Sequence, residues 1–379
     1  MPFKLFANAR ITGMKAKFQH LVAGLQQWLT NGPASTVGLD IGSGVLKLAE
    51  IDWHKNLPLL KAVGLAALPD GVVRDGTILD RAVLAETLRQ LLVTAGVTGT
   101  HAIISASGHA VFIRELIFPA MTTEELRQAI RWDLDKYIPS DADKYYFDFV
   151  VIGAGKEPHE IRVLLAAAPQ AMIDAIIAVC KESGLIPVAI DIEPLAVSRT
   201  LAAGAANSLV IDIGQKVCQL NILQDKCPVV SRLISLGGAR YTDVVMRSLE
   251  LDMHNAELIK KRQRGLLEAP ENGGDLTYIH KQLLLIVEEL GLEIRRTADY
   301  YQVQNREAVI ANIILTGGGA LLDNLAINLA AQLGGIEVRL NNPLSEIAIS
   351  KSLDSEWLNS IAAQLTVAVG LALRGGEGH

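Results

Sequence analysis

Two strands joined by a glycine turn are predicted by the sequence Val37-Gly-Leu-Asp40-Ile-Gly42-Ser43-Gly44-Val-Leu-Lys47-Leu-Ala-Glu-Ile51. Asp40 lies within the first apolar run, where a carboxylate is costly unless a cation or hydrogen-bond donors meet it. The glycines of the turn let backbone N–H groups approach an anion closely. The stretch therefore fits one wall of a site for phosphate and a metal ion. A plain β-hairpin with a capping aspartate would show the same pattern, so the rest of the chain has to decide between them.

A second stretch of the same design is Leu209-Val-Ile-Asp212-Ile-Gly214-Gln215-Lys216-Val-Cys-Gln-Leu-Asn-Ile-Leu223. Asp212 aligns with Asp40, and Gly214 aligns with Gly42. Two similar strand–turn–strand units predict two domains of like design. If the two turns face one polyphosphate, the two acids can hold a hydrated Mg²⁺, which keeps several waters and takes only one or two carboxylates.

The composition agrees with a large α/β protein. The chain has 379 residues, of which 50% are hydrophobic and 20% are charged, so two well-filled domains are expected. A net charge of −6 argues against a general nucleic-acid-binding protein. The three cysteines, Cys180, Cys218 and Cys227, lack metal-ligand spacing and are expected to be reduced, buried thiols of a cytosolic protein. No uninterrupted apolar run reaches the ~18 residues of a membrane span.

Strands and helices are predicted to alternate along the chain. Beyond the two hairpins, we expect strands at 61–68, 101–107, 111–118, 145–152, 161–167, 187–192, 233–236, 312–315 and 336–340, and helices at 80–95, 122–138, 171–183, 241–249, 281–307, 324–333 and 361–373. The pattern predicts a mixed sheet flanked by helices. One helix and about three strands at 109–165 form a small inserted α+β module, whose helix opens with a capping box at Thr122 and Glu125. Its aromatic strand, 145–152, is either a partner-binding edge or ordinary packing.

Residues 1–35 stand apart from these domains. They carry lysines and an arginine, no acid, and apolar residues at helical spacing. The pattern predicts a basic amphipathic helix rather than a cleaved signal peptide, because the apolar residues are striped and not continuous. The helix either docks on a membrane surface or a partner, or packs on its own domain.

Further candidate binding residues follow the second hairpin. Gly237 and Gly238 end a strand, and Glu257 and Lys260 share one face of a helix. The glutamate can accept hydrogen bonds from ribose hydroxyls while the lysine flanks the base, or the two form an ordinary surface ion pair. Gly317-Gly318-Gly319 follow an apolar strand, where the backbone can approach a nucleotide. Glu193, followed by Pro194, is either a water-positioning group or an acid favoured at a helix start.

Taken in order, these motifs resemble the actin-like ATPase superfamily, which includes actin, sugar kinases, chaperones and FtsA. The inserted module resembles the extra subdomain of the FtsA branch. Ile130-Arg-Trp-Asp-Leu-Asp-Lys-Tyr-Ile-Pro139 and Val369-Gly-Leu-Ala-Leu-Arg374 most resemble the PilM family of type IV pilus assembly. The resemblance implies two related ribonuclease-H-like domains around a nucleotide cleft, at 36–208 and 209–354, with a C-terminal helix, 355–379, that closes the first.

The resemblance also implies a role for each matching residue, with ATP and Mg²⁺ as cofactors. Asp40 and Asp212 face the metal, and Glu193 matches a catalytic connector acid. The nucleotide-binding residues it implies are Asp40, Gly42, Ser43, Gly44, Lys47, Asp212, Gly214, Gln215, Lys216, Gly237, Gly238, Glu257, Lys260, Lys261, Gly317, Gly318 and Gly319. The second turn, Gly214-Gln215-Lys216, departs from the glycine- and threonine-rich turn of many relatives, so hydrolysis is expected to be slow or incidental.

A cytoplasmic assembly factor at the inner face of the bacterial inner membrane is the function that the resemblance implies. Its expected partner is the N-terminal cytoplasmic segment of the membrane protein PilN, held in a groove beside the inserted module. Other inner-membrane pilus assembly proteins are expected as further partners. Membrane association through these partners or residues 1–35, and self-association, stay open. An FtsA-like filament former and a small-molecule kinase of the same superfamily are the alternatives.

Overall fold

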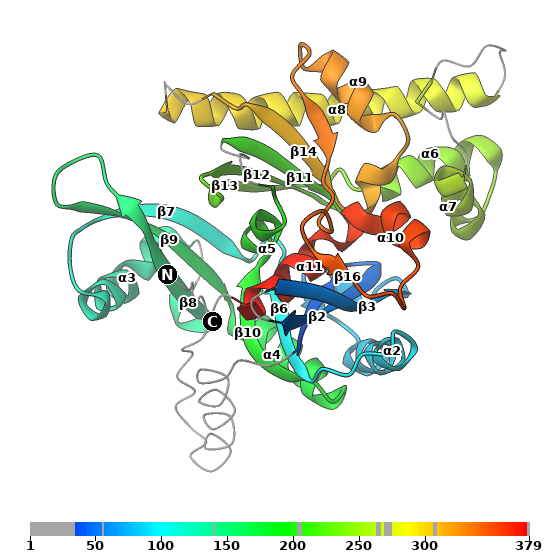
Figure 1. Ribbon diagram of the computed structural model, residues 1–379. Helices are drawn as coiled ribbons and strands as arrows, with labels where there is room; N and C mark the ends of the chain where they lie inside the picture. Colours follow the sequence, from blue (N-terminus) through cyan, green and yellow to red (C-terminus); the bar gives the residue numbers. More distant parts are fainter. Residues whose placement is uncertain are drawn as a thin grey trace. The chain divides into compact units, whose positions relative to one another are not determined.

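The computed structural model describes residues 35–54, 57–138, 141–202, 207–262, 267–268, 275–305 and 309–376. These residues form two compact units (Figure 1), with the first made from residues 35–200, 346–354 and 367–376, and the second from residues 201–345 and 355–366. The helix predicted at 1–35 lies outside the described residues, except that Ser35 begins the first strand. Of the predicted closing helix, 355–379, residues 355–366 belong to the second unit and only the part from 367 belongs to the first.

In the first unit the main sheet has six strands in the order β10-β6-β1-β2-β3-β16. The strands are β1 (Ser35–Ile41), β2 (Val45–His54), β3 (Leu57–Ala67), β6 (His101–Ala106), β10 (Ile186–Ile192) and β16 (Ala348–Ile349), with a small separate pair β4 (Val73–Arg74) and β5 (Thr77–Ile78). Strand β1 pairs antiparallel with β2 and parallel with β6. The sheet carries helices α2 (Arg81–Thr94), α4 (Gln170–Glu182), α5 (Glu193–Arg199) and α11 (Thr366–Leu373).

Helix α11 packs on the first unit's sheet at backbone distance. A Cβ atom added to Gly38 of β1 would lie 1.9 Å from the Ala368 carbonyl oxygen, and one added to Gly370 would lie 1.8 Å from the Ala196 carbonyl oxygen of α5. The glycines therefore let the helix touch both elements without intervening side chains. Just beyond it, the Arg374 guanidinium forms an ion pair with the fully buried Asp191 of β10 at 3.1 Å.

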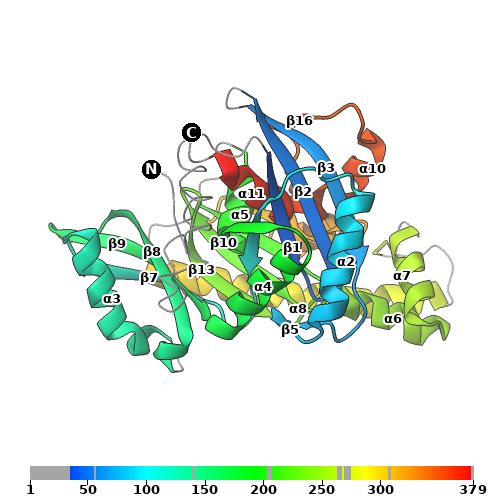
Figure 2. The same ribbon diagram turned by 90° about the horizontal axis from the view of Figure 1, so that it is seen from below.

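The inserted module is a three-stranded antiparallel sheet, β7-β9-β8, with one helix along it (Figure 2). Its elements are β7 (Phe112–Pro119), α3 (Thr123–Tyr137), a short 3-10 turn η1 (Ala142–Lys144), β8 (Tyr145–Ala154) and β9 (Glu160–Pro169). Leu126, Ile130 and Leu134 of α3 are buried against these strands. The predicted capping box is confirmed, because Thr122 and Glu125 make both reciprocal hydrogen bonds. The module runs to Pro169, beyond the predicted limit of 165.

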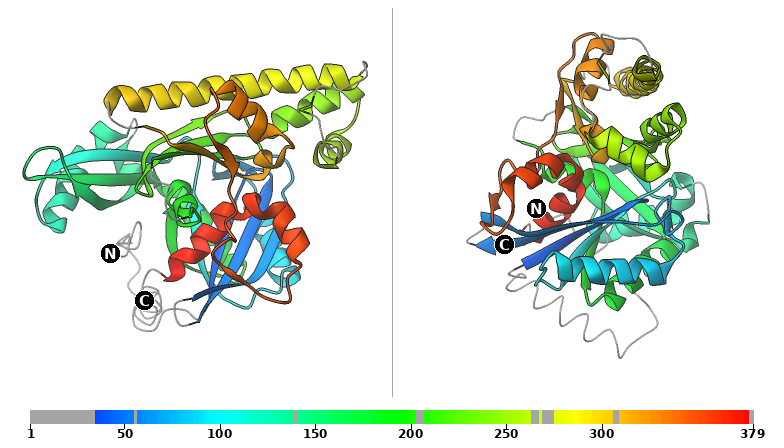
Figure 3. Two further views of the ribbon diagram at one scale, coloured as in Figure 1. Left: turned by 45° about the horizontal axis from the view of Figure 1, so that its top comes forward. Right: turned by 90° about the vertical axis from the view of Figure 1, so that its right-hand side faces the viewer.

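In the second unit the sheet has five strands in the order β13-β12-β11-β14-β15. The strands are β11 (Ser208–Ile213), β12 (Cys218–Gln224), β13 (Cys227–Ile234), β14 (Asn312–Thr316) and β15 (Val338–Leu340). The remaining elements are α6 (Ala239–Leu249), α7 (Met253–Arg262), the long α8 (Asp275–Gln304; Figure 3), η2 (Gly318–Leu321), α9 (Leu325–Gln332), α10 (Ser355–Ile361) and η3 (Ala362–Leu365), while η4 (Arg374–Gly376) ends the described chain in the first unit.

The two sheets repeat one topology. In each, an antiparallel meander of three strands is extended by two parallel strands on the side of its first member: β3-β2-β1-β6-β10 in the first unit and β13-β12-β11-β14-β15 in the second. Strands β1 and β11 therefore hold equivalent central places. The internal repeat predicted from the two hairpins is present at the level of whole sheets.

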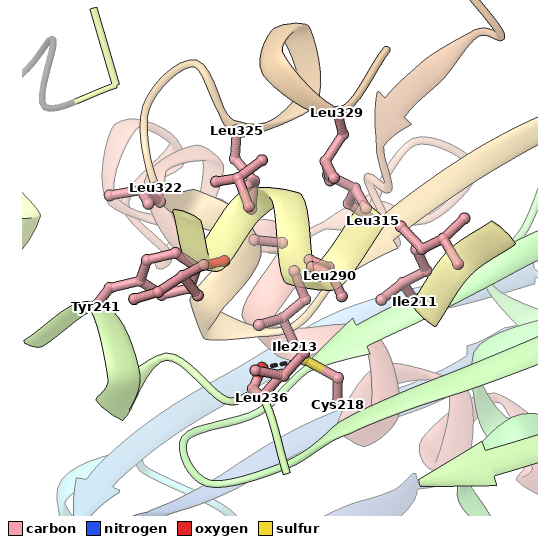
Figure 4. Close-up of a cluster of buried hydrophobic side chains, with 14 of the residues drawn as sticks. Ile211, Ile213, Cys218, Leu236, Tyr241, Leu290, Leu315, Leu322, Leu325 and Leu329 are labelled. Atoms are coloured by element: carbon pink, nitrogen blue, oxygen red, sulfur yellow. Dashed lines mark hydrogen bonds between the residues drawn. The ribbon is translucent and has the colours of Figure 1, made fainter. Parts of the chain in front are cut away.

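A dense apolar core fills the second unit between its sheet and helices (Figure 4). Ile211, Leu290 and Leu315 are fully buried there, next to Tyr241 at 1% exposure. The Cys218 thiol donates a hydrogen bond to the Leu236 carbonyl oxygen at 2.6 Å. Burial and the nearby Asp212 charge raise the pKa of this thiol. All three cysteines are free; Cys180 and Cys218 are buried as predicted, whereas Cys227 is only half-buried.

One helical run, Ser355–Gly376, is long and apolar enough to cross a membrane by length and composition alone. Its apolar residues are interrupted by Asn359, Ser360 and Gln364, so the sequence shows no uninterrupted apolar run of this length although the mean hydropathy is high. Within the run's apolar window 61% is buried, as expected for a core helix of a globular protein.

Candidate functional site

The first turn places a buried acid beside a lysine. Asp40, 3% exposed, lies opposite Lys47 in the β1–β2 register, and the Lys47 ammonium contacts the Asp40 carboxylate at 2.6 Å. The Gly42 amide donates to the Val45 carbonyl oxygen at 3.2 Å, which closes the turn. A Cβ atom on Gly42 would lie 2.8 Å from that oxygen. Lys47 is therefore not a solvated surface residue, since it neutralises a carboxylate that the strand has buried.

The second turn reproduces this geometry. The Gly214 amide donates to the Val217 carbonyl oxygen at 2.9 Å, and half-buried Asp212 holds the place of Asp40. Gln219 takes the register position of Lys47. An amide therefore takes the place that the lysine holds opposite the first acid, while Gln215 and Lys216 are exposed on the turn itself.

Two further glycine segments, 237–238 and 317–319, converge on the second turn. The Gly238 amide donates to the Gly214 carbonyl oxygen at 2.8 Å. A Cβ atom on Gly317 would lie 2.2 Å from an Asp212 carboxylate oxygen, and one on Gly238 would lie 3.5 Å from the Gly319 Cα. The backbone of residues 214, 237–238 and 317–319 is thus brought together within one unit. Side chains at these positions would fill the space between the segments or push the segments apart.

A polar network joins helices α6 and α7 at the same place. The Thr242 hydroxyl, on a residue 1% exposed, donates to the Glu257 carboxylate at 2.6 Å and accepts from the Lys260 ammonium at 2.8 Å. Lys260 also donates to the Gly238 carbonyl oxygen at 3.2 Å and forms an ion pair with Glu257 at 2.7 Å. Glu257 and Lys260 are therefore more than a surface pair, since they are tied to a glycine segment.

Thr242 was missed by the sequence prediction. Its position one helical turn after Gly238 places its hydroxyl where the ends of both α7 side chains meet. A polar residue one turn after a glycine pair is the signal that could have identified it. The side chain of Lys261, another predicted site residue, lies outside what the structure describes, although its backbone belongs to α7.

Glu193 lies at the first position of α5 and is half-buried, with Pro194 behind it. That position suits an acid, because unpaired N–H groups and the helix dipole favour negative charge there. The arrangement fits both interpretations that the sequence left open, a helix-start acid and a water-positioning group.

The donor set suits an anionic ligand with a hydrated cation better than a bare metal ion. Among the described residues no group of three or more His, Cys, Asp or Glu side chains is arranged to hold a metal. Single carboxylates beside glycine turns and lysines are what a Mg²⁺–phosphate complex uses, because the phosphates and waters supply the other ligands. The residues therefore fit a Mg²⁺–nucleotide and do not form a complete metal site by themselves.

Comparison with known proteins agrees with this architecture. A solved structure described as a PilM-PilN type IV pilus biogenesis complex is 30% identical, with a TM-score of 0.78 over 90% of this chain and 98% of the other. Ethanolamine utilization protein EutJ from Carboxydothermus hydrogenoformans is 17% identical, with a TM-score of 0.55 over 94% of this chain and 99% of the other, which shows a shared fold alone.

The repeated sheets and the similar structures define the protein as one with the actin-like ATPase fold, which confirms the predicted fold class. The family model of type IV pilus assembly protein PilM matches residues 38–376. The chain belongs to the PilM family.

Proposed function

We propose that this chain is a nucleotide-binding scaffold of type IV pilus assembly, with ATP and Mg²⁺ as its ligands. The observation that carries the nucleotide part is the meeting of three glycine segments with the Thr242–Glu257–Lys260 network in the second unit. Backbone amides close to a lysine and a glutamate suit phosphates on one side and a ribose on the other.

Each predicted residue has a role in this proposal. Asp40 and Asp212 hold waters of the hydrated Mg²⁺, and the turns at 42–44 and 214–216 contact phosphates. Lys47 has two partners available, the Asp40 carboxylate that it contacts now and an incoming phosphate. Glu257 and Lys260 hold the ribose and base, while residues 237–238, 261 and 317–319 line the adenosine side. Glu193 positions a water, and hydrolysis is slow.

The partner in this proposal is the N-terminal cytoplasmic segment of PilN. The support is the similarity over nearly the whole chain to the PilM of a PilM-PilN complex. We place the peptide beside the inserted module of β7, β8, β9 and α3, and we place the protein at the cytoplasmic face of the inner membrane. Nucleotide shifts the population between two conformations that differ in affinity for this peptide. Neither a kinase nor a filament former is favoured by the family match.

Nucleotide titrations of purified protein test the site. Asp40→Ala, Asp212→Ala and Lys260→Met should each weaken ATP–Mg²⁺ binding by about tenfold or more, which corresponds to about 1.4 kcal/mol. Exposed Asp299 and Lys281 of the second unit give matched controls, Asp299→Ala and Lys281→Met, which should bind as the parent does. Unchanged affinity in all three site variants would exclude the proposed site.

A separate measurement tests the partner. The full chain should bind a synthetic peptide of the PilN cytoplasmic N-terminus, and a peptide of the same composition in scrambled order should not bind. ATP-dependent polymers in sedimentation without peptide binding would support the filament former instead. Phosphorylation of a panel of small sugars would support the kinase.

A further inference from the structure

The outer face of helix α8 carries an unusual row of exposed apolar residues. Tyr278, Leu285 and Leu292 are 57%, 56% and 48% exposed, although the intervening Ile279, Leu283, Ile286 and Leu290 are buried in the core. The three exposed residues follow one another at intervals of seven. Residues seven apart on an α-helix differ by only about 20° around its axis, so the three side chains form one straight row. We call them the α8 row.

Two charged residues flank the α8 row on one side. Lys281 and Glu288 are exposed, and neither has an ion-pair partner among the described residues. They cannot pair with each other, because seven residues place them about 10 Å apart along the helix. No oppositely charged residue stands three or four positions from either of them. The described part of the chain therefore leaves both charges available to a partner.

We propose that the α8 row is a self-association surface, on which a second copy of the chain packs its own α8 in antiparallel orientation about a two-fold axis at Leu285. Such an interface is isologous, so each residue contact occurs twice. In this register Leu285 meets Leu285 of the second copy, and Tyr278 meets Leu292. All three members of the row are then covered by apolar side chains.

Charge complementarity selects this orientation. An antiparallel pair centred on Leu285 brings Lys281 beside Glu288 of the second copy, and the symmetry repeats the pair. A parallel two-fold pair would instead bring the flank with Lys281 and Glu288 against the opposite flank of the second copy. Lys281 would then meet Gln282 and Glu288 would meet Glu289, which gives no attractive pair and a repulsive one.

The α8 row selects the register. Centring the antiparallel pair on Leu292 would move Leu285 opposite Asp299 and leave Tyr278 beyond the overlap. With Leu285 at the centre, residues 275–295 overlap, which is about 30 Å of helix. A contact of one helix pair is small, so we expect a weak dimer that depends on protein concentration.

Site-directed cross-linking of the full chain tests the geometry. In a Cys227→Ser background, Leu285→Cys should form a covalent dimer on mild oxidation, since its own copy lies directly opposite. Val303→Cys is the matched control, because Val303 is exposed on the same helix but would lie about 54 Å from its own copy. Equal cross-linking at the two positions, or no cross-linking at Leu285, would overturn the proposal. A protein that stays monomeric because residues 1–34 of the same chain cover the α8 row would overturn it too.

Charge reversal tests the pairing. In sedimentation equilibrium, Lys281→Glu and Glu288→Lys should each weaken the dimer by about fivefold or more, since each converts two attractive contacts into repulsive ones. The double variant should restore the parent's affinity. Two single variants that weaken the dimer without rescue in the double variant would exclude this antiparallel register. Nucleotide binding should be unchanged in all three variants, which separates this result from the proposed site.

Discussion

At the scale of single residues, Gly317 shows why the candidate site needs glycine. Its φ of +85° lies in the left-handed region, and a Cβ atom there would overlap an Asp212 carboxylate oxygen at 2.2 Å. The Gly317 amide donates to the Ala363 carbonyl oxygen at 2.9 Å, so the backbone has little freedom to retreat. Backbone conformation and close approach to the acid both require a residue without a side chain.

Gly317→Ala should therefore lower both stability and nucleotide affinity. Gly334→Ala is the matched control, because Gly334 also has a positive φ, +77°, but a Cβ atom there meets nothing within 4 Å. The control should cost about 1–2 kcal/mol of unfolding free energy from backbone strain alone. The Gly317 variant should cost about 1–3 kcal/mol more, because the new atom also forces a neighbour to move. Urea unfolding measures the difference, and equal costs would show that the contact with Asp212 relaxes freely.

Asp191 is the second residue whose environment leads to a prediction. Burial alone raises the pKa of its carboxyl group, but the charges of Arg199 and Arg374 and a hydrogen bond from the Ile192 amide outweigh burial and hold the pKa below its usual range. Arg199 lies 2.9 Å and Arg374 3.1 Å from the carboxylate. The buried acid thus joins β10, α5 and the end of the chain.

Stability of the first unit should depend on this carboxylate being charged. Because the folded-state pKa is depressed, the stabilisation is present above the unfolded-state value of about 3.9 and is lost as the pH falls through the folded-state value. Asp191→Asn should lose about 3–5 kcal/mol near neutral pH, because the buried Arg374 and the largely buried Arg199 lose their charged partner. In the parent, the unfolding free energy measured with urea should fall between pH 6 and about pH 3, and the variant should show a smaller fall. Exposed Asp299→Asn should leave both quantities unchanged.

At the scale of elements, local patterns predicted most strands and helices, and long-range contacts decided what was missed. The strand expected at 61–68 is β3, Leu57–Ala67, because pairing with β2 and β16 extends it through residues with weak strand propensity. Strand β13, Cys227–Ile234, was predicted only as 233–236. Pro228 and Ser231 have low strand propensity, and it is hydrogen bonding to β12 that keeps these residues in the strand.

The candidate site shows the same division. The glycine turns and their acids were visible as a repeated motif, and the equal closing hydrogen bonds of Gly42 and Gly214 give that repeat a physical basis. Thr242 was not visible, because its role depends on the packing of α6 against α7. The contact between Lys47 and Asp40 follows from strand register, which the sequence alone did not specify.

Helix α3 of the inserted module offers a test at this scale. Thr122→Ala removes the side chain that accepts from the Glu125 amide, so it should lower the unfolding free energy by about 0.5–2 kcal/mol. Thr123→Ala, one residue later and also exposed, is the control and should change stability by less than about 0.5 kcal/mol. Thermal unfolding measures both. A larger effect in the control would mean that the capping box contributes little.

At the scale of the whole molecule, the proposed nucleotide and peptide ligands must be linked reciprocally. If ATP–Mg²⁺ changes the affinity for the PilN peptide by some factor, the peptide must change the affinity for ATP–Mg²⁺ by the same factor. We expect a factor of about 5–150, the range typical of coupled sites. Calorimetric titrations of each ligand with and without saturating amounts of the other measure both factors. Two independent affinities would contradict the proposed conformational coupling.

The packing of α11 has a consequence for how the protein is made. Gly38 of β1 meets the backbone of α11, and Gly370 of α11 meets the backbone of α5, so the first unit's sheet is covered by a segment that the ribosome synthesises after the whole second unit. Domains usually fold in order of synthesis, with the N-terminal domain first. Here the first unit cannot complete its fold, and the β1 surface stays uncovered, until the second unit has been translated. The first unit therefore acquires its final fold only after residues 201–366 have been synthesised, and any protection that the nascent chain needs has to last at least that long.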